Sequence, residues 1–371
     1  MNALRSLAKE IQGIDFSSND YLGIANNRIV FENAIGLLSD REIFNNGATG
    51  SRLLTGNGIL FSELENFLME FHQADSALIF NSGYDANIGL FSSVPQRDDI
   101  ILYDEYIHAS IRDGIKMSNA RNYKFRHNDP EDLCTQILRV INKGESNKNS
   151  EIYIVTESVF SMDGDSPDLK AILDLCRKYK CHLIVDEAHA VGLFGSNGRG
   201  IVPELELKEG IFARIITFGK ALGCHGAAIL GSEDLNKYLI NFARSFIYTT
   251  GLPPHSLATI MEAYRFLMSP EGLRERDLLH KNIAYFNKEK ERLGISSSFI
   301  PSCSAIHSCI IKGNNEVKDV AQKFKNNSFD IRPILSPTVP EGEERLRFCL
   351  HSFNSKEDIC IILQQLAQEI N

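Results

Sequence analysis

The segment IITFGKALG at residues 215–223 is the most informative stretch of this 371-residue chain. Its apolar start predicts a buried strand, which delivers a single lysine, Lys220, into small residues such as glycine and alanine. Burial or a nearby cation lowers the pKa of a lysine and makes its amine nucleophilic, and the glycines leave room for a flat ligand. The pattern is typical of a Schiff-base lysine, although on its own it also fits a solvated lysine after a strand.

The segment HLIVD at residues 182–186 predicts a second buried strand, which ends in Asp186. An acid at the carboxyl end of a strand faces the ligand crevice of an α/β sheet. The letters DEAH at 186–189 also occur in nucleotide-driven motors, but those need Gly-x-x-x-x-Gly-Lys-Ser/Thr, which this sequence lacks. The glycine-rich stretch at 192–200 does not have the spacing of a dinucleotide loop, so we interpret it as a mobile loop beside the site.

A phosphate-binding turn is predicted at Asn81-Ser82-Gly83-Tyr84, between an apolar strand at 77–80 and a helix over 85–90. The free amides and the positive dipole end of such a helix start suit a phosphate. Pyridoxal phosphate needs a lysine for its aldehyde, a carboxylate for its ring nitrogen and anion-binding amides for its phosphate. Lys220, Asp186 and this turn together match those three needs.

Composition argues against nucleic acid and membranes as partners. The 39 basic and 48 acidic residues give a net charge of -9, which disfavours nonspecific binding to nucleic acid. No apolar run approaches the roughly eighteen residues of a membrane span, and residues 1–12 lack the apolar core of a signal peptide. We therefore expect a cytoplasmic protein with small-molecule partners.

The eight cysteines fit reduced, scattered thiols better than a disulfide framework. Cys176, Cys181 and His182 superficially resemble metal ligands. Adjacent strand residues point to opposite faces, however, so Cys181 and His182 are poorly placed to share an ion, and we predict no metal site.

Apolar strand patterns alternate with helical ones through the first two thirds of the chain. The predicted strands are 77–80, 100–103, 152–156, 182–186, 214–218 and 227–230, with helices such as 169–178 between them. This alternation predicts an α/β fold with a large, mostly parallel sheet that helices cover on both faces. A polar loop is predicted at 142–150.

A smaller α/β domain is predicted after Pro253-Pro254. A long helix over 256–268 leads into it, followed by strands at 306–311, 330–334 and 346–351 and helices at 316–325 and 355–370. We therefore divide the chain into an N-terminal segment (1–44), a large cofactor-binding domain (45–252) and a linker helix with a small C-terminal domain (253–371).

Six segments, taken in order, resemble the α-oxoamine synthases. They are FSSNDYLG at 16–23, GSRL at 50–53, NSGY at 81–84, TESVFSMDGD at 156–165, DEAH at 186–189 and TFGK at 217–220. The resemblance runs from about Asp15 to the end of the chain. It implies a fold-type I pyridoxal phosphate transferase that condenses an amino acid with an acyl-CoA.

The resemblance also implies roles for residues around the cofactor ring. Lys220 forms the Schiff base, Asp186 pairs with the ring nitrogen, His189 bonds the phenolic oxygen, and His108 stacks on the ring face. Ser161 lies near the ring.

Further roles concern the phosphate and the substrate. Glu157 supports Ser161, and the phosphate is surrounded by Ser82, Gly83, Tyr84 and Thr217. Thr250 reaches the phosphate of the neighbouring subunit, which implies a homodimer with shared active sites. Arg347 receives the substrate carboxylate with Asn19 as a second contact, and we expect Arg345 to be a surface or structural charge.

The tail PTVPEG at 337–342, followed by RLR at 345–347, is most similar to the family branch of biotin biosynthesis. That branch condenses L-alanine with pimeloyl-CoA, or with a pimeloyl carrier protein, to 8-amino-7-oxononanoate, CoA and CO2. Glycine C-acetyltransferase and other α-oxoamine synthases remain alternatives, and a noncatalytic binding subunit on the same fold is an alternative of another class.

Two positions depart from the family pattern. Phe61 stands where members often carry histidine, which suggests a change of packing. Leu335-Ser336-Pro337 replaces an Arg-Pro-Pro sequence of the biotin branch, so we expect that the acyl specificity can differ.

Overall fold

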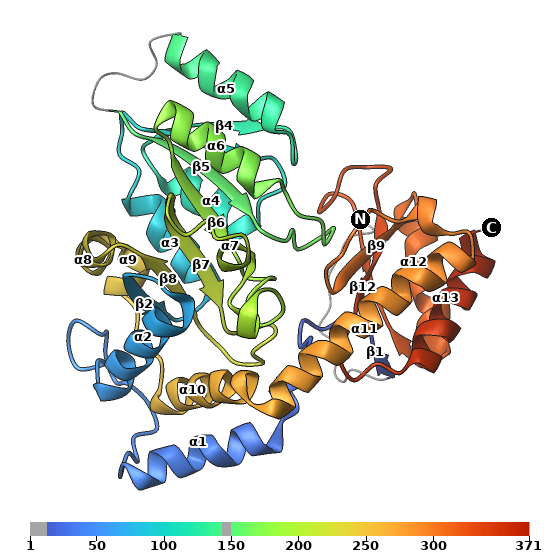
Figure 1. Cartoon of the computed structure of the whole chain (residues 1–371), viewed down its shortest axis with the longest axis horizontal. Coiled ribbons are helices and arrows are strands. Elements are labelled where there is room, and N and C mark those ends of the chain that lie inside the picture. The colour runs from blue at the N-terminus through green and yellow to red at the C-terminus, as the bar shows by residue number, and fades with distance from the viewer. Residues whose placement is uncertain (1–12, 143–149, 371) are drawn as a thin grey trace. The chain divides into compact units, whose positions relative to one another are not determined.

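The computed structural model describes residues 13–142 and 150–370, which form two compact units. The larger unit comprises 24–160 and 166–269, and the smaller one comprises 13–23, 161–165 and 270–370. The predicted boundaries at 44 and 252 differ from these. Helix α1 (Arg28–Asp40) packs along α10 (Pro254–Met268), and α10 packs on α2 (Ile59–His72) (Figure 1). Helices α1 and α10, which the predicted boundaries placed outside the large domain, therefore belong to the larger unit.

A seven-stranded sheet forms the centre of the larger unit, with the order β2-β8-β7-β6-β5-β3-β4. Its strands are β2 (Ser76–Phe80), β3 (Ile100–Asp104), β4 (Arg121–Phe125), β5 (Ile152–Glu157), β6 (His182–Asp186), β7 (Ile211–Thr217) and β8 (Ala227–Gly231). Strands β3 to β7 run parallel, whereas β8 is antiparallel to both of its neighbours. The predicted α/β fold with a large, mostly parallel sheet is confirmed.

Alternating side chains of the strands build two hydrophobic cores, one on each face of the sheet. Ile101 and Ile184 belong to the core under α3 (Gly83–Ser93), α4 (Ala109–Met117) and α8 (Glu233–Phe242). Their neighbours Ile100 and Leu183 belong to the core under α5 (Pro130–Asn142) and α6 (Leu169–Tyr179). Burying each such side chain contributes about 1.5–3 kcal/mol.

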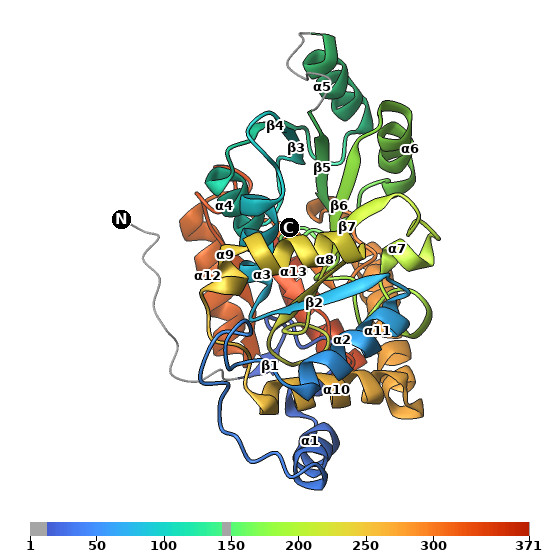
Figure 2. The ribbon, with the colours of Figure 1, turned by 90° about the vertical axis from the view of Figure 1, so that its left-hand side faces the viewer.

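The first of these two faces also carries a short helix, α9 (Arg244–Ile247), which follows α8 and packs on α3 (Figure 2). The remaining helical turns of the larger unit are η1 (Ile24–Asn26), η2 (Ser196–Gly198) and α7 (Ile201–Glu204). No helix in the described parts of the chain is long and apolar enough to cross a membrane.

The structure corrects our interpretation of residues 192–200 as a mobile loop. The Gly192 amide donates to the Gly198 carbonyl at 2.8 Å, and the Gly200 amide donates to the Phe194 carbonyl at 2.9 Å. Gly198 has φ +76°, and a Cβ there would lie 2.8 Å from the Gly192 backbone. The glycines therefore allow a tightly closed loop, because a side chain at that position would be excluded.

The smaller unit contains a three-stranded antiparallel sheet, in the order β11-β12-β9, and a parallel pair of β1 with β10. Its strands are β1 (Ile14–Asp15), β9 (Ile306–Ile310), β10 (Phe329–Asp330), β11 (Arg332–Ile334) and β12 (Arg345–Cys349). Its helices are α11 (Pro270–Arg292), η3 (Ser296–Ser298), α12 (Asn314–Asn326) and α13 (Lys356–Ile370). The strand predicted at 330–334 is thus two short strands, which pair with different partners.

Three sequence predictions need comment. Strand β4 was missed because its residues are mostly polar and exposed, so it shows no apolar pattern. The interpretation of residues 1–12 lies outside the described residues, and so does most of the polar loop predicted at 142–150.

Lys290 is a buried lysine in the smaller unit, with 5% of its surface exposed. Its Nζ lies 4.6 Å from the ring centre of Phe299 and 5.5 Å from that of Phe286. No carboxylate of the described residues lies within ion-pair distance of it. Burial lowers its pKa from 10.5 to about 8. The folded protein therefore releases this proton at a lower pH than the unfolded chain does.

We predict that Lys290→Met raises the free energy of unfolding at pH 7 by about 2 kcal/mol, after allowance for solvent near Nζ. Between pH 8 and 10.5 the lysine is protonated in the unfolded chain and deprotonated in the folded protein. The free energy of unfolding of the wild type therefore contains a contribution that increases with pH across this range, and the variant lacks this contribution. Urea unfolding at pH 7 and at pH 10.5 measures both effects. Lys288→Met, at an exposed lysine, is the control. An equal change in the free energy of unfolding for the two variants contradicts a destabilising buried charge at Lys290.

Candidate active site

Strand β7 and a tight turn after it position Lys220. The Phe218 amide donates to the Gly226 carbonyl at 2.9 Å, and the Gly223 amide donates to the Lys220 carbonyl at 2.8 Å. Gly223 has φ +61°, and a Cβ there would lie 2.2 Å from the Ala25 amide nitrogen. The half-buried lysine is thus held on a closed turn at the end of a strand.

Asp186 lies at the carboxyl end of β6, as predicted, and it is 5% exposed. Its Oδ1 accepts the Ala188 amide at 2.9 Å, and its Oδ2 accepts Asn87 Nδ2 from α3 at 3.1 Å. Two neutral donors therefore fix a buried carboxylate without neutralising it. His189, three residues later, is also buried.

Asn87 connects Asp186 to His108. Its Nδ2 also lies 3.0 Å from Ser110 Oγ, which in turn lies 2.7 Å from His108 Nδ1. His108 is the N-cap of α4, and its Nδ1 accepts the Ser110 amide. Burial and the nearby Lys220 lower the pKa of His108, and Asp186 partly opposes this. The imidazole is therefore neutral near pH 7.

Glu157 ends β5 beside Asp186, with which it is in register. The side chain is buried, and its Oε1 accepts the His108 backbone amide at 2.5 Å. Burial, together with the Asp186 charge, raises the pKa of Glu157 well above its usual value. Glu157 therefore anchors the His108 backbone from a position directly beside Asp186. This contact differs from the predicted support of Ser161.

The predicted phosphate turn begins α3. Ser82 is the N-cap, and its Oγ accepts the Asp85 amide at 3.0 Å and donates to the Asp85 carboxylate at 2.8 Å. Gly83 lies against Thr217, since a Cβ on Gly83 would approach Thr217 Cγ2 to 2.7 Å. Thr217 Oγ1 is buried and has no hydrogen-bond partner within the described part of the chain. An unsatisfied hydroxyl thus lies beside the helix start.

Two other predicted phosphate residues are more exposed. Tyr84 is 50% exposed, and its hydroxyl donates to Asp113 at 3.0 Å, so its side chain has a surface partner. Thr250 is exposed, and its carbonyl accepts Asn81 Nδ2 at 2.6 Å.

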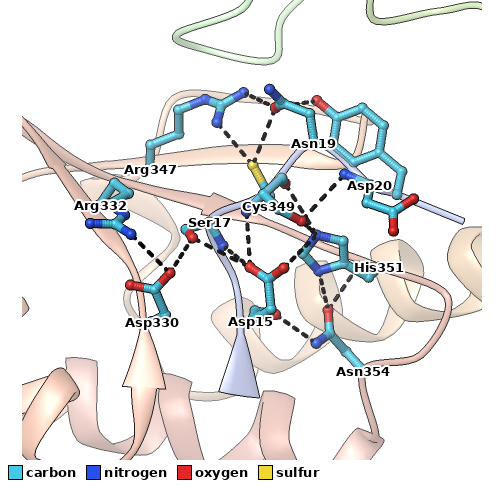
Figure 3. A network of polar contacts seen from close by, with 12 residues as sticks. Asp15, Ser17, Asn19, Asp20, Asp330, Arg332, Arg347, Cys349, His351 and Asn354 are labelled. Carbon is cyan, nitrogen blue, oxygen red and sulfur yellow. Dashed lines mark hydrogen bonds and ion pairs between the residues drawn. The ribbon is translucent and has the colours of Figure 1, made fainter. Parts of the chain in front are cut away.

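The smaller unit positions Arg347, which is 8% exposed on β12 (Figure 3). Its Nε donates to the Ser161 carbonyl at 2.7 Å, and its Nη2 donates to Asn19 Oδ1 at 3.1 Å. Its Nη1 contacts the Cys349 sulfur at 2.9 Å, and the Tyr21 side chain also hydrogen-bonds the guanidinium. A thiol and a phenol are both weaker partners for a guanidinium than a carboxylate is.

Arg345, two residues earlier on the same strand, has a different environment. It is 2% exposed and forms an ion pair with Asp163. Arg347 makes no ion pair with any carboxylate among the residues described. Arg345 is therefore a structural charge, as expected, whereas Arg347 is a buried cation available to an anion.

A polar network holds Asn19 in place beside Arg347 (Figure 3). Tyr21 donates from its hydroxyl to Asn19 Oδ1 at 3.1 Å. Asp15 accepts the Ser17 and Ser18 amides at 2.8 and 2.9 Å, which fixes the chain just before Asn19. The sequence motif FSSNDYLG thus folds so that its asparagine contacts the arginine of β12.

Residues 11–366 match the family described as aminotransferase class I and II. The chain belongs to this family. The 8-amino-7-oxononanoate synthase of Emericella nidulans is 39% identical over 366 residues, which cover 95% of this chain and 88% of that protein. A putative 8-amino-7-oxononanoate synthase of Geobacillus kaustophilus is 37% identical over 356 residues, with 95% and 88% covered.

Two solved structures share the fold of this chain. Serine palmitoyltransferase from S. paucimobilis has a TM-score of 0.88 at 27% identity, with 96% of this chain and 87% of that chain covered. The 8-amino-7-oxononanoate synthase of Francisella tularensis has a TM-score of 0.79 at 28% identity, with 96% and 98% covered. The predicted resemblance to the α-oxoamine synthases is confirmed, and the chain is a fold-type I, pyridoxal-phosphate-dependent acyltransferase.

The predicted site residues fall into two groups. The larger unit holds Lys220, Asp186, His108, His189, Ser82, Gly83, Tyr84, Thr217 and Thr250, and the smaller unit holds Asn19, Ser161 and Arg347. Sequence reasoning missed Asn87 and Ser110. Asn87 is a polar residue on a buried face of α3, and this was the available signal, because a buried amide needs polar partners.

Proposed function

We propose that this enzyme condenses L-alanine with pimeloyl-CoA, or with a pimeloyl carrier protein, to give 8-amino-7-oxononanoate, CoA and CO2 in the biotin pathway. The observation that carries the proposal is similarity over 95% of the chain to relatives named 8-amino-7-oxononanoate synthase. The proposed substrates are charged and water-soluble, and we propose a cytoplasmic location.

The donor set of the larger unit fits pyridoxal phosphate. The buried Asp186 carboxylate suits a protonated ring nitrogen, and the unsatisfied Thr217 hydroxyl with the α3 amides suits a phosphate. Ser82, Gly83 and Tyr84 belong to the same helix start, and Thr250 is assigned to the partner's phosphate. When bound, the cofactor supplies an electron-withdrawing ring that stabilises negative charge at Cα of an attached amino acid.

Within this proposal, Lys220 has two tasks. It binds the cofactor aldehyde through Nζ, and, once its amine is free, it takes the proton from Cα of the amino acid. His108 stacks on the ring as a neutral imidazole, in keeping with its lowered pKa. A neutral His108 leaves the Asp186 charge to the ring nitrogen, and His189 is assigned to the phenolic oxygen.

Arg347 is assigned to the substrate carboxylate. Its buried guanidinium makes no ion pair with a carboxylate among the described residues, and its Nη1 contacts a thiol. A carboxylate matches the planar fork of a guanidinium better than a sulfur does. Asn19 is the second contact in this assignment, and Ser161, whose carbonyl accepts Arg347 Nε, is assigned a place near the ring.

The sequence departs from the biotin branch at a position relevant to the acyl group, because Leu335 stands where that branch has an arginine. Glycine C-acetyltransferase and serine palmitoyltransferase activities are the main alternatives. One methylene changes discrimination by only about 1–3 kcal/mol, so related thioesters must be compared directly. A noncatalytic subunit is disfavoured, because such a scaffold has no need of Lys220.

The test is thiol release from pimeloyl-CoA, acetyl-CoA and palmitoyl-CoA, each with L-alanine, glycine and L-serine. The proposal predicts the highest kcat/KM for L-alanine with pimeloyl-CoA. Preference for glycine with acetyl-CoA, or for L-serine with palmitoyl-CoA, assigns the enzyme to another branch of the family.

A homodimer with shared sites is part of the proposal. Segment 29–59 exposes several large apolar side chains: Ile29, Phe31, Ile35, Phe44, Leu53, Leu54 and Ile59, each 46–81% exposed. Such a set on one stretch of chain marks an interaction surface.

We predict that Leu54→Asp, at a residue 81% exposed, weakens dimerisation at least about tenfold, because it places a charge in an apolar contact. Sedimentation equilibrium of wild type and variant measures the dissociation constant. Met117→Asp, at an exposed residue 57% accessible on α4, is the control. A monomeric wild type contradicts the proposed dimer.

A further inference from the structure

Asn81 is the last residue before the helix start proposed to bind phosphate, and it follows the edge strand β2. Its Nδ2 donates to Thr249 Oγ1 at 3.0 Å and to the Thr250 carbonyl at 2.6 Å. One side-chain amide thus uses both of its N–H groups on the segment that contains Thr250.

A second set of contacts fixes the same segment to the rest of the larger unit. The Gly251 amide donates to the Gly50 carbonyl at 2.9 Å. Arg52, close to Gly50 in the chain, forms an ion pair with Glu65 at 2.6 Å, and Glu65 Oε1 accepts the Ile79 amide at 3.0 Å. Strand β2, which is an edge strand of the sheet in the described part of the chain, is therefore tied to residues 50–52 and, through Asn81, to residues 249–250.

Asn81 therefore contacts two parts of the proposed phosphate sites. Along the chain it precedes Ser82, the N-cap of α3. Through its side chain it holds the Thr249–Thr250 backbone, which the proposed function assigns to the phosphate of the partner subunit. We expect a shift of Asn81 to move both elements, because its side-chain amide is hydrogen-bonded to Thr249 and to Thr250 at the same time.

We infer that Asn81 is a positioning residue that supports both cofactor sites of a dimer, its own through Ser82 and the partner's through Thr250. The inference rests on the proposed dimer and cofactor, and goes beyond them by assigning a shared support. Two sites that depend on one hydrogen-bonded element are energetically coupled.

Asn81→Asp is the sharpest substitution, because it keeps the shape of the side chain and removes both N–H donors. A carboxylate oxygen would then face the Thr250 carbonyl oxygen, so the contact becomes repulsive. We expect the dissociation constant for pyridoxal phosphate to rise about tenfold, because the Thr249 hydroxyl can donate to the new carboxylate and only the hydrogen bond to the Thr250 carbonyl is lost. Asn241→Asp is the matched control, because Asn241 Nδ2 donates to the Lys237 carbonyl within the same helix, α8.

Heterodimers with two affinity tags separate the two supports. Lys220→Ala silences one site, so the absorbance of lysine-bound cofactor reports only on the other. In the first heterodimer, an Asn81→Asp chain pairs with a Lys220→Ala chain, and the reporting site has an altered turn of its own. In the second, one chain carries both substitutions, and the reporting site, in the wild-type chain, receives an altered Thr250 segment from its partner.

Weaker binding of pyridoxal phosphate in both heterodimers, relative to a wild-type chain paired with Lys220→Ala, is the expected result. Weakening confined to the first heterodimer, or an effect no larger than that of Asn241→Asp, overturns the inference while the proposed function stands. Failure of the reference heterodimer to bind the cofactor, or to form, overturns the proposed function and the inference with it. Circular dichroism and thermal melting of every chain exclude a folding defect as the cause.

Discussion

Replacing Lys220 with alanine should lower turnover by at least about 10⁴-fold, because one substitution removes a covalent anchor and a proton-transfer group. The variant should also lose the absorbance of lysine-bound pyridoxal phosphate when the cofactor is added. Thiol release from the acyl-CoA and a visible absorption spectrum measure the two effects. The turn around Lys220 is held by backbone hydrogen bonds, so the fold should survive the change.

The control for Lys220→Ala is Lys237→Ala, which removes an exposed lysine of α8 from the same unit. It should leave both turnover and absorbance near the wild-type values. Substantial turnover in Lys220→Ala, with an unchanged substrate preference, would show that this lysine is not part of the mechanism. It would also contradict the assignment of the active site in the larger unit.

Replacing Arg347 with glutamine should raise KM for the amino acid and lower kcat/KM by about 10²–10³-fold. This corresponds to the loss of charge-assisted hydrogen bonds to a carboxylate. Arg347→Lys should fall between wild type and glutamine, since it keeps the charge and loses the fork. Saturation curves for the amino acid, at fixed acyl-CoA, measure the effect. KM for the acyl-CoA should change much less.

Arg345→Gln is the matched control on the same strand. It breaks the buried ion pair with Asp163, so it should lower the midpoint of thermal unfolding, with KM for the amino acid closer to wild type than in Arg347→Gln. Equal effects of the two substitutions on KM would indicate that Arg347 supports the strand and does not receive the substrate.

Much of the larger unit could be predicted because its parallel strands are buried on both faces. Ile100, Ile101 and Leu102, for example, all lie in the core, so the strand reads as a continuous apolar run. Lys220 and Asp186 could be placed for the same reason, since each follows such a run. Strand β4 lacks this signal because its side chains are mostly exposed.

The supporting contacts could not be predicted, because they depend on strand order and on helix rotation. Glu157 neighbours Asp186 only because β5 pairs with β6 in that register. Asn87 reaches Asp186 and Ser110 only because α3 turns that side chain toward the sheet. Cys349 looked like a scattered thiol in the sequence, yet in the structure it is the acceptor for Arg347 Nη1.

The domain boundaries could not be predicted from the sequence either. Proline pairs and composition mark 253 as a natural break in the sequence. In the structure, α10 begins directly after that point but still belongs to the larger unit, because it packs against α1 and α2. Residues 161–165 join the smaller unit through the Arg345 and Arg347 side chains, a long-range contact that no local pattern encodes.

The most direct measurement uses L-alanine labelled with carbon-13 in its carboxyl group, together with pimeloyl-CoA and the enzyme loaded with pyridoxal phosphate. The account predicts that labelled CO2 appears in step with free CoA and that the amino ketone product, identified by mass spectrometry, carries no label. CoA released without labelled CO2, or a product that retains the label, would contradict decarboxylative condensation.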